Sequence, residues 1–142
     1  MKKKVIISAC LLGAECRYDG KSNRLPEEKL RELSEKYEII PVCPECYGGL
    51  TTPRVPSERV GDSVLSKTGT DVTKQFNRGA EAALYLAKLL GADMAILKEN
   101  SPSCGSGTIY DGTFSGTLTP GDGVTAQLLK ANGIAVIGES EI

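Results

Sequence analysis

Three short apolar runs constrain the fold of this chain most strongly, because each of them ends close to a cysteine. The pairs of run and cysteine are residues 5–7 with Cys10, residues 39–42 with Cys43, and residues 94–97 with Cys104. Short apolar runs of this kind are typical of buried strands in a parallel sheet. Open α/β sheets usually place their ligand sites where such strands end and enter a loop. We therefore expect three thiols to meet at one edge of a sheet as ligands of a metal site.

Amphipathic segments alternate with the apolar runs and are expected to be helices. They are residues 26–37, a segment from Asp71 or Thr73 to residue 90, and residues 123–132. Apolar residues recur at helical spacing in the first two, and Gly91 and Gly133 follow the last two in the usual C-terminal position. A fourth apolar run, residues 134–137, is the last predicted strand. This order predicts parallel strands with helices packed on the sheet.

Two hairpins are expected between these elements. The first turns at Gly61-Asp62, between two short apolar pairs. The second covers residues 109–114 and is expected to turn tightly at Asp111-Gly112, because Asp-Gly favours a type I′ turn.

The length of 142 residues is that of one domain and is sufficient to bury a core without disulfides. The pattern of elements predicts an α/β fold. We expect a single domain over residues 1–142, with a mostly parallel, Rossmann-like sheet covered by helices and a small hairpin insertion.

The charge and hydropathy of the chain exclude several classes of partner. Net charge is −1, from 17 basic and 18 acidic residues, so no overall field attracts nucleic acid or a membrane surface. No apolar run approaches the roughly 18 residues of a membrane span. Residues 1–4 lead into an apolar stretch that is too short for a signal peptide. We expect a cytoplasmic protein with no membrane partner.

The five cysteines are expected to be reduced in that compartment, so they do not form a disulfide framework. They are then metal ligands, catalytic groups or small buried apolar residues. Histidine is absent, which removes the commonest general base and all mixed Cys/His metal sites. Any proton transfer must therefore use carboxylates, hydroxyls, lysines or water.

The spacing of Cys43 and Cys46 allows three interpretations. A thioredoxin-like redox pair needs its first cysteine at a helix N-terminus, and no helix is expected around Cys46. A structural zinc site normally uses two such pairs, and the chain has one. An iron–sulfur cluster suits thiolates from separate loops. The residues alone leave these three open.

Two polar residues are further candidates for the site. Glu45 lies two positions after Cys43, although a solvated carboxylate is a common alternative. Ser101 precedes Pro102 and could equally serve only a turn. Basic residues that could balance charge in the site are Arg17, Arg54 and Lys98.

Six short motifs follow one another along nearly the whole chain. They are residues 8–13 (SACLLG), 16–20 (CRYDG), 43–45 with 48–50 (CPE and GGL), 52–54 (TPR), 101–105 (SPSCG) and 109–112 (IYDG). In this order they resemble the TudS-type thiouracil desulfidase family. The resemblance implies a [4Fe-4S] cluster held by only Cys10, Cys43 and Cys104, with the fourth iron open to substrate sulfur. The family often has an aliphatic residue in place of Cys46, which implies no ligand role for it, while the role of Cys16 stays open.

The resemblance also implies removal of sulfur from thiouracil without net redox change. Glu45 would then be the general base for water, and Ser101 would bind the substrate ring or position the water. The small charge and few aromatic residues favour a small-molecule substrate over long RNA. The alternatives are desulfuration of thiolated tRNA, and a non-catalytic four-cysteine protein that binds zinc or an iron–sulfur cluster.

Overall fold

Four parallel strands form the central sheet of the computed structural model, which describes residues 2–142 and leaves Met1 of the predicted domain outside the description. In spatial order, the strands are β2 (Tyr37–Val42), β1 (Lys3–Ser8), β5 (Met94–Leu97) and β8 (Ala135–Gly138). Val5 of β1 pairs with both Ile39 and Met94. The predicted α/β fold with a mostly parallel sheet is confirmed, and the strand order is added by the structure.

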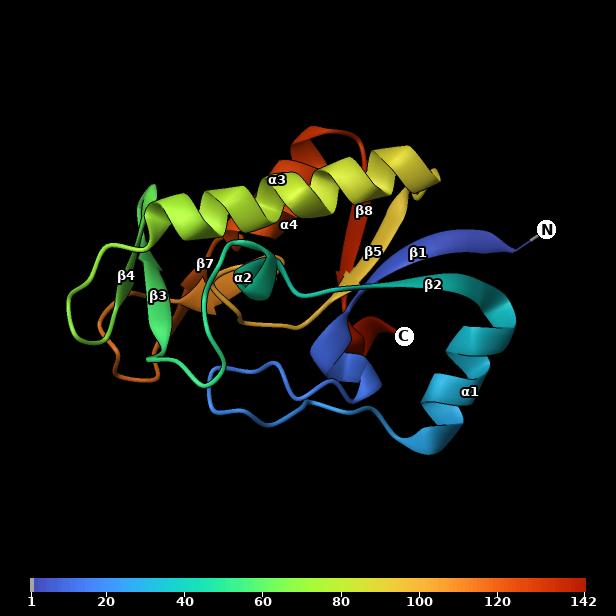
Figure 1. Cartoon of the computed structure of the whole chain (residues 1–142), viewed down its shortest axis with the longest axis horizontal. Helices are drawn as coiled ribbons and strands as arrows, with labels where there is room; N and C mark the ends of the chain where they lie inside the picture. The colour runs from blue at the N-terminus through green and yellow to red at the C-terminus, as the bar shows by residue number, and fades with distance from the viewer. Residues whose placement is uncertain (1) are drawn as a thin grey trace.

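The longer helices cover the two faces of this sheet. They are α1 (Glu27–Lys36), α3 (Thr73–Leu90) and α4 (Val124–Ala131), close to their predicted bounds. Figure 1 shows α3 and α4 on one side of the sheet and α1 on the other. Short 3₁₀ turns follow the first and last strands, η1 (Ala9–Leu12) and η2 (Glu139–Glu141).

The sheet divides the core into two layers. Side chains alternate along a strand, so Ile6 faces one layer while Val5 and Ile7 face the other. The layer against α3 and α4 includes Ile6, Val42, Ala87, Leu97 and Leu129. The layer against α1 and η1 includes Val5, Ile7, Leu11, Leu33 and Ile96. Each buried branched side chain contributes about 1.5–3 kcal/mol, so this packing fixes the strand ends from which the site is built.

Two hairpins extend one end of the molecule. The first pairs β3 (Ser57–Val60) with β4 (Ser63–Ser66), as predicted. The second pairs β6 (Thr108–Tyr110) with β7 (Leu118–Pro120), and the tight turn predicted for it is wrong. A wider loop, residues 111–117, joins these strands, and Asp111 N–H donates to the carbonyl of Thr117 across its base. Contacts with β3 described below hold this loop open.

A single helical turn, α2 (Pro44–Tyr47), follows β2 and differs from the expectation of no helix around Cys46. Cys43 is its N-cap residue and Pro44 occupies the first turn, where a missing N–H costs nothing. Four residues are too few for hydrophobic periodicity to reveal such a turn in the sequence.

Two glycines let α2 pack directly against α3. A Cβ atom at Gly79 would lie 1.8 Å from the carbonyl oxygen of Pro44, and one at Gly48 would lie 1.9 Å from that of Gln75. Both distances are shorter than any real contact, so only glycine allows this approach. The contact fixes the position of the segment that carries Cys43 and Glu45.

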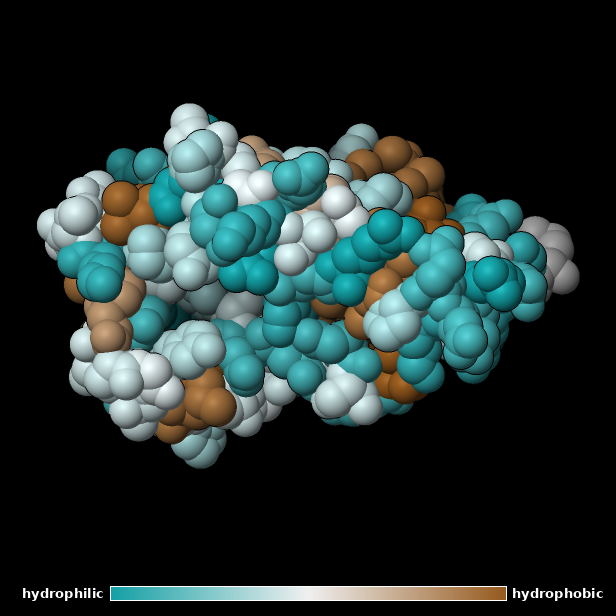
Figure 2. All heavy atoms as spheres, turned by 90° about the horizontal axis from the view of Figure 1, so that it is seen from below, coloured by the Kyte–Doolittle hydropathy of each residue, from teal (hydrophilic) through white to brown (hydrophobic). Residues whose placement is uncertain are grey.

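The surface seen in Figure 2 is mostly hydrophilic, with apolar side chains in small scattered groups. Exposed apolar residues elsewhere include Tyr85 and Leu89 on α3. Among residues 2–142, no helix is both long and apolar enough to cross a membrane.

Candidate active site

A cavity of about 470 Å³ lies at the carboxyl ends of β1, β2 and β5. Its wall continues through β3 and through the loop of residues 111–117. Figure 2 shows a hollow in the surface at the end of the molecule that carries the hairpins. The C-terminal ends of the parallel strands therefore meet at one cavity that opens to the surface, as expected for an open α/β sheet.

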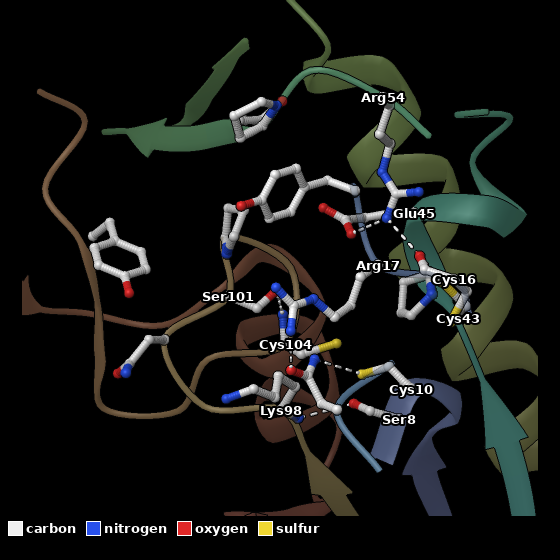
Figure 3. Close-up of a pocket in the computed structure, with 18 of the residues that line it drawn as sticks. Ser8, Cys10, Cys16, Arg17, Cys43, Glu45, Arg54, Lys98, Ser101 and Cys104 are labelled. Atoms are coloured by element: carbon white, nitrogen blue, oxygen red, sulfur yellow. Dashed lines mark hydrogen bonds and ion pairs between the residues drawn. The ribbon is translucent and has the colours of Figure 1, made fainter. Parts of the chain in front are cut away.

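Four of the five cysteines line this cavity, and they reach it from different segments. Cys10 lies in η1 after β1, Cys43 caps α2 after β2, and Cys104 lies in the loop after β5. Cys16 lines the cavity from the loop after η1, whereas Cys46 does not line it. Figure 3 shows the labelled thiols around one space. The structure thus brings together the three thiols expected at the strand ends.

Burial raises the pKa of two of the thiols that line the cavity, Cys10 and Cys104. It raises the pKa of Cys104, which is only 6% exposed, to about 12, and it also raises the pKa of Cys10. The pKa of Cys43 is also raised. The hydrogen bond with Cys16 is the larger cause, and burial adds to it.

Cys16 and Cys46 both lie close to Cys43. The sulfur of Cys46 lies 3.3 Å from that of Cys43 and 3.6 Å from the hydroxyl of Thr52. The hydrogen bond with Cys43 lowers the pKa of Cys16. Only Cys16 of these two is positioned to meet a group bound in the cavity.

The donor set fits a cluster better than a single metal ion. Within residues 2–142, no three Cys, Asp or Glu side chains are close enough together to hold one ion. Structural zinc requires four ligands within about 2.3 Å of the metal. Soft thiols spread around a cavity suit a larger iron–sulfur group. Cys10, Cys43 and Cys104 are thiols at this cavity that could hold such a group.

Glu45 faces the cavity as one half of an ion pair. Its Oε2 atom lies 2.7 Å from Nη2 of Arg54, whose side chain is 8% exposed. The same nitrogen donates to the Cys16 carbonyl at 3.0 Å, and Nη1 of Arg54 donates to Thr52 Oγ1 at 3.1 Å. Several bonds on one guanidinium hold it in place, so the Glu45 carboxylate has a fixed orientation.

Ser101 serves a turn and also lines the cavity. Its Oγ atom accepts the backbone N–H groups of Ser103 and Cys104, each at 3.1 Å. These bonds shape the turn that presents the Cys104 thiol. They use the oxygen only as an acceptor, so the hydroxyl proton is available to donate into the cavity.

Other polar side chains around the cavity hold its walls together. The Ser8 hydroxyl accepts the backbone N–H of Lys98 at 2.9 Å, which links the ends of β1 and β5. Lys98 forms an ion pair with Glu139 at 2.7 Å. Arg17 donates to Asn23 Oδ1 at 2.9 Å, and Asn23 Nδ2 in turn donates to the Cys10 sulfur at 3.4 Å.

The cavity-lining residues that sequence reasoning missed include Asn23, Glu58 and Phe114. Asn23 lies in a polar stretch without periodicity, which offers no signal. Glu58 alternates within a short hairpin strand like any surface residue. Phe114 carried one usable signal, because a large aromatic residue is unusual in a stretch of glycine, serine and threonine.

The fold and the cavity define a class: an α/β protein that gathers thiols, a carboxylate and a serine at the ends of parallel strands. A family comparison gives a narrower assignment. The model of the 2-thiouracil desulfurase family matches residues 5–141, and the chain belongs to this family.

Two individual relatives are similar to this chain over almost its whole length. The chain is 45% identical to the uncharacterized protein YbbK of Bacillus subtilis (strain 168), over 97% of both proteins. Among solved structures, it resembles that of the [4Fe-4S]-dependent thiouracil desulfidase TudS. The TM-score is 0.95 and the identity 48%, over 99% of this chain and 93% of the other.

Proposed function

We propose that this chain is a [4Fe-4S]-dependent thiouracil desulfidase, with the activity carried by one domain of residues 1–142. The reaction replaces the thiocarbonyl sulfur with oxygen from water and releases hydrogen sulfide, without net redox change. The family match and the structure of TudS support it. The observation that carries it is the meeting of three cysteine thiols, Glu45 and Ser101 at one cavity.

In this proposal the cluster is held by Cys10, Cys43 and Cys104. When bound, the cluster supplies a Lewis-acidic iron that suits the soft sulfur of a thiocarbonyl group. Cys46 does not line the cavity and has no ligand role, and Cys16 lines it beside the proposed ligands. None of the five cysteines, all within residues 2–142, forms a disulfide, which fits the reducing cytoplasm in which we place the protein.

Glu45 accepts the proton of the attacking water. Arg54 binds Oε2, which leaves Oε1 to face the water. The buried guanidinium keeps the carboxylate in one orientation and balances its charge. The chain has no histidine that could take this role.

Ser101 donates its hydroxyl proton to a polar atom of the substrate ring or to the attacking water. The two backbone bonds to its oxygen prevent the side chain from rotating freely, so the donor is already oriented. The turn that Ser101 stabilises also carries Cys104, so the proposed substrate contact and a proposed cluster ligand lie on one short segment.

The proposed substrate is a small molecule, either free 2- or 4-thiouracil or a thionucleoside. A cavity of about 470 Å³ lies within the usual range for small-molecule sites, roughly 300–1,000 Å³. The low net charge of −1 gives long RNA no general attraction.

The test is anaerobic reconstitution with iron and sulfide, followed by metal analysis and assays of free thiouracil and thiolated tRNA. We expect about four irons per chain, a broad brown absorption and turnover of the free base. A colourless protein that binds one zinc ion would contradict the proposal. Turnover restricted to tRNA would keep the chemistry but overturn the substrate.

A further inference from the structure

We infer that Phe114 determines specificity for the substrate, and that Glu58 is the residue that positions it. The Phe114 ring forms a wall of the cavity on which the planar thiouracil ring stacks. This inference rests on the proposed function and assigns a further residue to the same site. It is carried by the backbone of Phe114, by the bonds of Glu58 and by the distribution of aromatic residues.

Aromatic residues are few in this chain and gather at the cavity. There are five tyrosines, two phenylalanines and no tryptophan. Three of these residues, Tyr18, Tyr110 and Phe114, line the cavity. The other phenylalanine, Phe76, is fully buried in the core. Phe114 is therefore not accounted for by core packing.

The backbone of Phe114 adopts an unusual conformation. Its φ angle is +57°, in the left-handed region that bulky residues rarely enter. Such strain persists only where surrounding contacts impose it, and it is concentrated at functional sites. Glycine or asparagine adopts this conformation with less strain, so the loop conformation alone does not call for a phenylalanine here.

Glu58 imposes this conformation from β3. Glu58 is only 8% exposed. Its Oε1 atom accepts the backbone N–H of Gly112 at 2.9 Å and the backbone N–H of Phe114 at 3.2 Å. Gly112 also packs tightly on β3, since a Cβ atom there would lie 2.7 Å from Val60 Cγ2. The buried Glu58 carboxylate is thus hydrogen-bonded to the loop that carries Phe114.

A fixed aromatic wall selects planar aromatic substrates. Stacking of a base on an aromatic side chain depends on its flat π-face and not on the position of its substituents. The wall therefore favours thiouracils over a non-aromatic thioamide with the same C=S group. It does not distinguish the 2-thio from the 4-thio isomer.

The experiment compares 4-thiouracil with thioacetamide on the reconstituted enzyme. In Phe114→Ala, we expect kcat/KM for 4-thiouracil to fall by about 5- to 100-fold, mainly through KM, while that for thioacetamide changes little. Phe114→Tyr keeps the ring and should stay within about threefold of wild type. An equal loss for both substrates, or no loss, would overturn the inference.

The positioning role of Glu58 has its own matched pair of variants. Glu58→Gln keeps an oxygen that accepts both N–H groups and should retain the selectivity for 4-thiouracil. Glu58→Ala releases the loop and should lose it as Phe114→Ala does. The double variant should lose no more than either single one, because both act through one contact. Additive losses would show that Glu58 acts elsewhere.

Binding of uracil separates this inference from the proposed function. Equilibrium dialysis with radiolabelled uracil needs no turnover, and Phe114→Ala should weaken binding by a similar factor. If the wild-type protein binds uracil but releases no sulfide, the proposed function fails while the aromatic wall stands. Equal uracil affinity in wild type and Phe114→Ala would overturn the wall. Thermal unfolding of each variant verifies that it is folded.

Discussion

Glu45 is the side chain on which proton transfer depends in the proposed reaction. Glu45→Gln preserves the shape and can still accept the Arg54 hydrogen bond, but it cannot take a proton from water at neutral pH. We expect kcat to fall by roughly 10²- to 10⁴-fold, the usual contribution of a positioned general base. Iron content and the visible spectrum should match those of wild type. Near-normal turnover would mean that water is activated by another group.

The five cysteines should divide into two groups on substitution. Replacing Cys10, Cys43 or Cys104 by serine should abolish the broad brown absorption and the activity, since a hydroxyl is a poor ligand for iron. Cys46→Ser is the matched control, because its sulfur lies near that of Cys43 but outside the cavity lining. The ligand assignment would be wrong if Cys46→Ser lost the cluster while Cys43→Ser kept it.

Site residues differed in how far sequence could predict them. Cys10, Cys43 and Glu45 lie directly after apolar strands, and the carboxyl ends of parallel strands meet at one edge. Their meeting at the cavity follows from that rule. Asn23 and Phe114 reach the cavity through loops whose paths depend on contacts with distant segments, such as the bond from Phe114 to Glu58. No local pattern encodes such paths.

Among the elements, the packing of α2 on α3 has the clearest consequence. Alanine normally stabilises a helix interior relative to glycine by up to about 1 kcal/mol. At Gly79 the sign should reverse, because the added Cβ would lie 1.8 Å from the Pro44 carbonyl oxygen. We expect Gly79→Ala to destabilise the protein by roughly 1–3 kcal/mol in urea unfolding. Iron content should also fall, since α2 follows Cys43.

Asn77→Ala on the same helix is the control for this prediction. The side chain is exposed, so the change should leave stability within about 0.5 kcal/mol or raise it slightly. Equal stability of the two variants would show that α2 can move away from α3 without cost.

Elements with strong periodicity were predicted correctly, and elements set by long-range contacts were not. Helices α1, α3 and α4 and the strands of the sheet follow from apolar spacing and terminal glycines. The α2 turn and the wide loop of residues 111–117 depend on packing against α3 and β3. The tight turn predicted at Asp111-Gly112 does not form, because Glu58 accepts two backbone N–H groups of this loop and holds it in a wider shape.

Asp122 links Gly107, in the loop that follows Cys104, to Lys130 of α4. Its ionisation makes the free energy of unfolding depend on pH. Burial alone would raise the pKa of Asp122, but hydrogen bonds from Lys130 at 2.9 Å and from Gly107 N–H at 2.7 Å outweigh it and lower the pKa. A lowered pKa stabilises the fold above the unfolded-state pKa of about 3.9 and loses this effect as pH falls further.

The prediction for Asp122→Asn follows from that sign. The variant should lose about 1 kcal/mol of unfolding free energy at pH 7. The difference from wild type should shrink as the pH falls below about 4, where the wild-type carboxylate is protonated first in the unfolded state and, at lower pH, in the folded state. Urea unfolding of both proteins between pH 3 and pH 7 measures this. A difference that is constant across the range would show that the charge of Asp122 is not responsible.

At the scale of the whole molecule, we expect no tight binding of a long nucleic acid, because the chain has little excess positive charge. Net charge is −1, and each of Arg17, Arg54 and Lys98 at the cavity is paired with an acidic side chain. We expect tRNA to bind no more tightly than about 10⁻⁵ M at physiological salt, as in weak non-specific binding. Free thiouracil should be turned over at the same rate with or without excess tRNA. Tight tRNA binding that weakens steeply with added salt would contradict this, because such a slope counts the phosphates that the protein neutralises.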